Sequence, residues 1–192
     1  ELPSRSSGGS GRVFIAGLPR SGGTLIEQIL GAHSRVRTTG ESGLLERLLA
    51  DESGAYAGDP VGLSGALDGV AGLTAVATAY DGALAGADFV TDKSIENVEL
   101  LGAIAQLFPD AVVVRVRRDL ADTALSCFFH DFAGRYDYVH DLGDAGFAAA
   151  CIDRLWDDLA ATLPVRVVEV DYAGLVAAPE PHIRALIAGC GL

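Results

Sequence analysis

The residues best suited to chemistry lie near the start of the chain, in the segment RVFIAGLPRSGGT (residues 12–24). An apolar run over residues 13–16 predicts a buried strand, and a glycine-rich turn separates it from a helix predicted over Leu25–Ala32. The order strand, loop, helix directs backbone N–H groups and the positive end of a helix dipole towards one point. The segment therefore predicts a loop that binds a phosphate-like anion.

The spacing Gly17-x-x-x-x-Gly22-Gly23-Thr24 is that of a nucleotide-binding P-loop with one substitution. Gly23 stands where a nucleoside triphosphatase carries the lysine that reaches the β- and γ-phosphates. The loop carries a cation at Arg20 instead. These residues indicate an anion site that has given up triphosphate chemistry.

Length and composition narrow the function classes. The 192 residues suffice for one domain with a buried core, and they include no apolar run long enough to span a membrane. The net charge of −12 argues against broad nucleic-acid binding, because a phosphate backbone would be repelled. Three scattered cysteines, Cys127, Cys151 and Cys190, are too few for a disulfide framework or a zinc site. We expect them to be buried, reduced thiols, and we expect no metal.

The composition of residues 1–11 is typical of a linker, which leaves residues 12–192 as a single domain. The chain has no methionine, even at position 1, which indicates an excerpt from a longer chain. An N-terminal targeting signal therefore cannot be judged from these residues, and we expect a cytoplasmic location.

Strands alternate with helices along the rest of the chain. Further strands are predicted over 36–39, 89–91, 111–116 and 165–170, and further helices over 44–49, 73–85, 96–107, 120–129, 146–162 and 179–188. This alternation predicts an α/β fold of P-loop type with three layers, in which helices flank a central, mostly parallel sheet. Residues 51–72 read as a loosely helical insert and residues 133–145 as a polar, aromatic loop. Ser42 and Asp119 are the expected N-caps of the helices that follow them.

Three cations follow directly on predicted strand ends: Arg20, Lys93 and Arg118. Ligands of parallel α/β sheets lie beyond the carboxyl ends of the strands, so we expect these side chains to meet at one edge.

Arg118 and Ser126 form a candidate phosphate site, with Arg118 at a strand end and Ser126 about two turns into the next helix. A guanidinium can chelate two phosphate oxygens while a hydroxyl donates to a third. The alternatives are an ion pair of Arg118 with Asp119 or Asp122, and a Ser126 that simply faces a neighbouring element.

Lys93 is the only lysine among 14 basic residues, which suggests a need for a compact charge at one oxygen atom. Glu41, at a predicted corner after a glycine, could act as a general base, or could be a solvated or helix-capping acid. His33, His130 and His140 compete for the role of base, and no pair of them has metal-ligand spacing. The pair Asp171-Tyr172 reads as structural.

The motifs IAGLPRSGGT, TGES, VTDKSIEN, VRVRRDLADTALSCFF and VVEVDYAGL fall in the order and spacing of a sulfotransferase domain. Over residues 12–192 the chain resembles the bacterial branch that is often fused to tetratricopeptide repeats, and it is also similar to the protein-tyrosine sulfotransferases. The resemblance implies transfer of a sulfuryl group from 3′-phosphoadenosine 5′-phosphosulfate (PAPS) to an acceptor hydroxyl or amine. Adenosine 3′,5′-bisphosphate would be the other product, and no metal would take part.

The resemblance also implies roles for individual residues. Glu41 matches the base, while Lys93 and Arg20 match the cations that stabilise charge between sulfur and the leaving phosphate. Arg118 and Ser126 match the residues that hold the 3′-phosphate. The 5′-phosphosulfate would be held by the loop Arg20, Ser21, Gly22, Gly23, Thr24 and Leu25.

Three departures from the family pattern accompany the resemblance. Gly22-Gly23-Thr24 replaces the usual GTT, so one hydroxyl is lost. One extra residue stands between Val36 and Glu41 relative to the tyrosine-modifying relatives, and the chain stops before a segment that in relatives closes over the nucleotide.

Two other functions stay open, a P-loop kinase-like phosphotransferase and a non-catalytic nucleotide-binding module. The expected acceptor is a peptide tyrosine, a sugar or a small molecule. We expect no nucleic-acid or membrane partner, and a longer parent chain with repeat domains would fit the resemblance.

Overall fold

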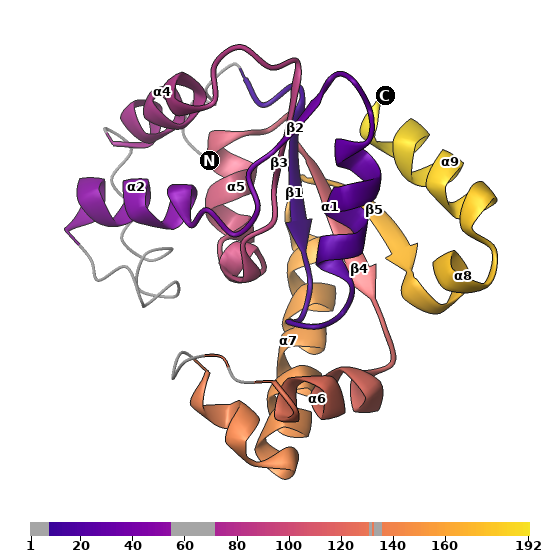
Figure 1. Cartoon of the computed structure of the whole chain (residues 1–192). Helices are drawn as coiled ribbons and strands as arrows, with labels where there is room; N and C mark the ends of the chain where they lie inside the picture. The colour runs from indigo at the N-terminus through magenta and orange to yellow at the C-terminus, as the bar shows by residue number, and fades with distance from the viewer. Residues whose placement is uncertain (1–7, 55–71, 131, 133–135) are drawn as a thin grey trace.

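The computed structural model describes residues 8–54, 72–130, 132 and 136–192. Its centre is a five-stranded, all-parallel sheet with the strand order β2-β3-β1-β4-β5 (Figure 1). The strands are β1 (Arg12–Ala16), β2 (Val36–Thr38), β3 (Phe89–Asp92), β4 (Val112–Arg117) and β5 (Arg166–Asp171). The predicted α/β fold is confirmed.

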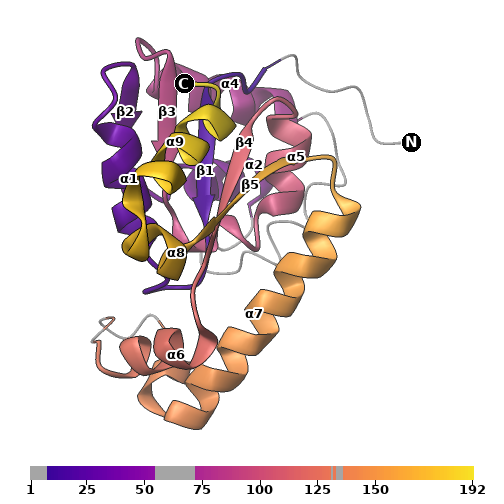
Figure 2. The same cartoon turned by 90° about the vertical axis from the view of Figure 1, so that its right-hand side faces the viewer.

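Helices cover both faces of the sheet (Figures 1 and 2). On β1, Phe14 and Ala16 join one core cluster, with residues of α2, α4, α5 and α7, while Val13 and Ile15 join the other, with residues of α1, α8 and α9. This alternation, together with burial of both sets, is typical of a parallel strand between two helical layers. The helices are α1 (Gly23–Gly31), α2 (Leu44–Ser53), α4 (Leu73–Ala83), α5 (Leu101–Leu107), α6 (Leu120–Phe128), α7 (Leu142–Thr162), α8 (Tyr172–Ala177) and α9 (Pro179–Cys190).

Several predicted boundaries were wrong. The helix predicted over 96–107 is a 3₁₀ turn, η2 (Ile95–Asn97), followed by α5. Much of the loop predicted over 133–145 is regular, because η3 (Asp137–His140) leads into α7, whose first turn Asp141 caps through bonds from two backbone N–H groups. The chain also forms α8 directly after β5, where only the later helix was predicted.

The cap predictions differ in outcome. Asp119 caps α6 by accepting a hydrogen bond from the backbone N–H of Asp122, as predicted. The N-cap of α2 is Gly43, and Ser42 only accepts a bond from the N–H of Leu44 at 3.2 Å. Of the insert predicted over 51–72, residues 51–53 belong to α2, and residues 55–71 lie outside the described residues.

The long helix α7 extends past the sheet and carries α6 at its far end (Figure 2). Arg115 of β4 anchors it, because its buried guanidinium pairs with Asp153 at 2.7 Å and Asp157 at 2.6 Å on α7. The same guanidinium lies 5.1 Å from the ring centre of Trp156 and pairs with Glu169 of β5 at 3.2 Å. These contacts place α6 next to the carboxyl ends of the strands.

Candidate functional site

The loop after β1 turns back sharply before α1 begins. Arg20 has a left-handed backbone, with φ 67°, and Gly22, the N-cap of α1, has φ 115°. The N–H of Ser21 donates to the carbonyl of Leu18 at 3.1 Å, and the N–H of Leu25 donates to that of Gly22 at 2.9 Å. The result is a tight loop at a helix N-terminus, the geometry that favours an anion.

A cavity of about 430 Å³ opens at this loop, beyond the carboxyl ends of β1, β3 and β4. All three predicted cations line it, together with Glu41. The expectation that Arg20, Lys93 and Arg118 meet at one edge is therefore met by the described geometry. The other described lining residues include Gly17, Ser21, Gly22, Gly23, Thr24, Ser94, Glu96, His130, Phe132, Tyr136 and Tyr172.

Arg118 and Ser126 both contact Arg20. The Nη1 of Arg118 donates to the carbonyl of Arg20 at 3.0 Å, and the Nε of Arg20 donates to the Oγ of Ser126 at 3.3 Å. The Arg118 guanidinium also lies 5.1 Å from the ring centre of Tyr172 and 4.0 Å from the carboxylate of Asp122, the ion pair considered as an alternative. Both candidate anion-binding residues thus lie beside the glycine loop.

Lys93 reaches the site from the end of β3. Its ammonium donates to Oε1 of Glu41, and its side chain is mostly buried. A Cβ built on Gly23 would lie 3.5 Å from Cγ and Cδ of Lys93. The aliphatic part of Lys93 therefore runs over the loop position where a triphosphatase has its own lysine.

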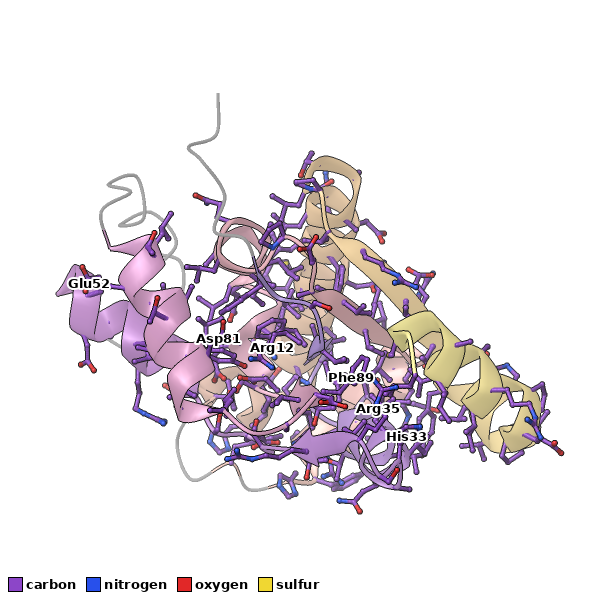
Figure 3. All side chains as sticks on the ribbon, turned by 90° about the horizontal axis from the view of Figure 1, so that it is seen from above. Arg12, His33, Arg35, Glu52, Asp81 and Phe89 are labelled. Atoms are coloured by element: carbon purple, nitrogen blue, oxygen red, sulfur yellow. The ribbon has the colours of Figure 1, made fainter. Side chains whose placement is uncertain are left out.

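Two other cations, Arg12 and Arg35, lie at the opposite end of the sheet, where the strands begin (Figure 3). Arg12 pairs with Asp81 at 2.8 Å, and Arg35 lies 4.9 Å from the ring centre of Phe89. His33 lies in this region as well, where its Nδ1 accepts a bond from the N–H of Arg35 (Figure 3). His33 is therefore too far from the cavity to serve as its base.

The comparisons with known proteins show the family of the chain. A model of the sulfotransferase family matches residues 12–192. The chain belongs to the sulfotransferase family. It is 31% identical over 200 residues to an uncharacterized protein of Aquifex aeolicus (strain VF5), and it spans about a quarter of that relative's length.

Solved structures share the fold of this sulfotransferase domain. The sulfotransferase domain of the Synechococcus PCC 7002 olefin synthase matches with a TM-score of 0.65 and 18% identity, over 100% of this chain and 77% of the other. Sulfotransferase STF1 of Mycobacterium tuberculosis H37Rv gives a TM-score of 0.62 and 17% identity, over 96% of this chain and 68% of the other. A sulfotransferase of Alicyclobacillus acidocaldarius gives a TM-score of 0.61 and 15% identity, over 97% of this chain and 82% of the other. At these identities the likeness shows the fold alone.

Two predicted binding residues do not line the cavity. Leu25 is partly exposed, and its N–H is used within the first turn of α1. Ser126 stands behind Arg20 rather than in the cavity wall. Of the remaining histidines, His130 lines the cavity and His140 does not.

Aromatic side chains, some of them from the loop interpreted as polar and aromatic, form one wall of the cavity, and Tyr172 lines it as well. The rings of His130, Phe132 and Tyr136 meet edge to face, with centroid separations of 4.7 and 5.4 Å. The hydroxyl of Tyr136 donates to Oε1 of Glu96 at 2.8 Å. The structural role expected of Asp171 and Tyr172 agrees with their contacts, since Asp171 caps α8 and the Tyr172 ring packs against Arg118. Tyr172 also lines the cavity, and its position directly after a strand is the signal that identified Lys93 and Arg118.

Cys127 and Cys190 are buried, whereas Cys151 is exposed, so the prediction of three buried thiols was wrong for Cys151. Burial raises the pKa of Cys127, against the opposing effect of Arg20 and Arg118, and its Sγ donates to the carbonyl of Pro19 at 3.3 Å.

Within residues 8–54, 72–130, 132 and 136–192, no cluster of three His, Cys, Asp or Glu could hold a metal. In the same residues no helix combines the length and apolarity needed to cross a membrane.

Proposed function

We propose that this domain transfers a sulfuryl group from PAPS to an acceptor hydroxyl. The observation that carries the proposal is the junction of a glycine anion loop with cations from the ends of three strands around one cavity, without the lysine of a triphosphatase. A donor with a phosphosulfate at one end and a phosphate at the other requires positive charge in more than one place.

The donor would be bound through both of its anionic ends. The helix N-terminus and the residues Arg20, Ser21, Gly22, Gly23 and Thr24 would hold the 5′-phosphosulfate, because their amides and side chains border the cavity. Arg118 would chelate the 3′-phosphate from the cavity wall, and Ser126, which stands behind Arg20, would act on the donor through Arg20 by accepting the bond from its Nε.

In the proposed reaction the acceptor oxygen attacks sulfur in line with the bridging oxygen. A new S–O bond forms as the bond from sulfur to the bridging oxygen breaks, and that oxygen leaves with the electron pair on adenosine 3′,5′-bisphosphate. Glu41 takes the acceptor proton, while Lys93 and Arg20 stabilise the charge on the leaving oxygen. A positioned base is typically worth about 10²–10⁴ in rate, and a donor to the developing charge about 10²–10³.

The acceptor would lie against the aromatic wall of His130, Phe132 and Tyr136, on the same side of the cavity as Glu96. Rings that meet edge to face leave apolar area for a planar or apolar acceptor body. We therefore place phenolic or apolar alcohols first among the acceptor classes, ahead of sugars.

Calorimetric titration with adenosine 3′,5′-bisphosphate tests the donor assignment. We expect saturable binding that Arg118→Ala weakens by at least tenfold, because a charged bidentate contact is lost. ATP with magnesium is the control ligand, and Arg35→Ala, at the other end of the sheet, is the control variant. The proposal is wrong if the bisphosphate does not bind, or if Arg118→Ala leaves its affinity unchanged.

A phosphotransferase is the second candidate, and Gly23 is the feature that argues against it. Tighter binding of ATP with magnesium than of the bisphosphate would favour that candidate. A non-catalytic module would bind the bisphosphate and release none of it from PAPS.

A further inference from the structure

A buried carboxylate, Glu27, lies directly behind the corner that carries Glu41. It belongs to α1 and is only 4% exposed. Its Oε1 accepts hydrogen bonds from the N–H of Gly40 at 2.9 Å and from the hydroxyl of Thr91 at 3.1 Å. A carboxylate removed from water is costly unless strong hydrogen bonds replace the lost ones. One of the two groups that donate to Glu27 is the N–H of Gly40, the residue immediately before Glu41.

The corner depends on such outside contacts. Gly40 and Gly43, on either side of Glu41 and Ser42, both have left-handed backbones, with φ 65° and 57°. The carbonyl of Gly40 accepts a bond from the N–H of Lys93 at 3.1 Å. Gly43 is tied to α2 by the bond from the N–H of Arg47 to its carbonyl, whereas residues 40–42 lie between β2 and α2, so their position is set by the groups that bind their backbone.

A second buried carboxylate holds the other end of the corner. Asp92 is 2% exposed and accepts a bond from the hydroxyl of Ser94 at 2.8 Å. The same Oγ of Ser94 accepts a bond from the N–H of Gly43 at 3.2 Å. The corner is thus tied to α1 through Glu27 and to the end of β3 through Asp92 and Ser94.

We propose that Glu27 is a positioning residue that, together with Asp92 and Ser94, fixes the corner and thereby the pair formed by Glu41 and Lys93. The inference rests on the proposed function, in which Glu41 takes the acceptor proton and Lys93 stabilises the leaving oxygen. A displacement of reacting groups by about 1 Å can cost about 10²-fold in rate. Loss of Glu27 should therefore reduce turnover far more than donor affinity.

Two variants of Glu27 test whether its hydrogen bonds hold the corner, one without an acceptor and one with a weaker acceptor. Glu27→Met removes the acceptor at similar length, and Glu27→Gln keeps a neutral acceptor in its place. Amide hydrogen exchange followed by NMR reports on the corner without any ligand, and we expect the Gly40 amide of Glu27→Met to exchange at least tenfold faster. With PAPS and 4-nitrophenol as probe acceptor, we expect release of the bisphosphate to fall about 100-fold in Glu27→Met and by less in Glu27→Gln. The Kd for the bisphosphate should stay within about twofold.

Tyr80→Phe is the matched control. Its hydroxyl donates to Oδ2 of Asp92 at 2.9 Å, whereas Ser94 binds Oδ1, so the variant loses a buried hydrogen bond in the same polar region and keeps the bonds that join Asp92, Ser94 and Gly43. We expect it to be less stable to urea and to keep both its turnover and its protection at Gly40.

The inference is overturned if Gly40 exchanges equally fast in Glu27→Met and wild type, or if Tyr80→Phe loses as much turnover. A wild-type chain that fails to bind the bisphosphate would instead refute the proposed function, while exchange at Gly40 would still decide whether Glu27 holds the corner.

Discussion

Gly22 is the position where the backbone of the anion loop tolerates a side chain least. Its φ of 115° lies outside the range that L-residues adopt readily. A Cβ there would lie 2.4 Å from Cδ2 of Tyr172, well inside the contact distance. The substitution Gly22→Ala therefore combines backbone strain with a clash against a ring at the edge of the cavity.

The magnitude follows from these two terms. A left-handed backbone costs an alanine about 1–2 kcal/mol, and an extra methyl group in a packed place costs about 1–3 kcal/mol. We expect Gly22→Ala to lower the free energy of unfolding by about 2–5 kcal/mol. To relieve the clash, the Tyr172 ring has to move, and Arg118, which lies over that ring, moves with it. Affinity for adenosine 3′,5′-bisphosphate should therefore fall by at least tenfold.

Urea denaturation and calorimetric titration measure the two effects. Gly23→Ala is the matched control, since its Cβ would meet Lys93 at an ordinary 3.5 Å and the position opens α1. In the double variant Gly22→Ala/Tyr172→Ala the clash is absent, so Gly22→Ala should lower the free energy of unfolding less than it does in wild type. The part of the loss that is due to backbone strain should remain. If Gly22→Ala stays within about 0.5 kcal/mol of wild type, or if the double variant recovers nothing, the reasoning about this loop fails.

Three further predictions follow from the same geometry. Arg115→Met should lower the free energy of unfolding by about 3 kcal/mol in urea, because buried guanidinium contacts are lost, whereas Arg117→Met, at an exposed pair, should change it by less than about 0.5 kcal/mol. Glu41→Gln should abolish release of the bisphosphate from PAPS and preserve its binding, and equal turnover would exclude Glu41 as the base. Burial raises the pKa of Cys190 from 9.0 to about 11, so the unfolded thiol ionises first and stability should fall between pH 9 and 11. Melting curves of Cys190→Ala, which lacks this contribution, should decline less over that range.

The fold could be predicted because a buried parallel strand leaves a clear mark in the sequence. Val112, Val113 and Val114 are consecutive, apolar and buried, as a central strand between two layers requires. The site cations could be found for a related reason. A charged residue directly after such a run lies at the edge where ligands bind, and Lys93 and Arg118 both do.

The supports of the site could not be predicted. Within α1, Leu25 is partly exposed while Glu27 is buried, the reverse of what hydrophobic periodicity indicates. The partners of Glu27 lie 13 and 64 residues away, and no local pattern joins them. The start of α7 was missed because Gly143 and Gly146 disfavour a helix, a cost offset when Ala145 and Ala149 are buried next to them.

The contact between Lys93 and Glu41 joins two parts of the proposed reaction. In a triphosphatase the loop itself carries the lysine, whereas here the ammonium comes from the end of β3 and donates to the carboxylate proposed as base. An ammonium has three donors, so Lys93 can bind a leaving oxygen while it keeps its bond to Glu41, whose other lone pairs stay open to the acceptor proton. Neutralisation of the leaving group and removal of the proton would thus depend on one pair of side chains. The corner that we propose Glu27 to hold positions this pair, because the same residue, Gly40, binds Glu27 through its N–H and the backbone of Lys93 through its carbonyl.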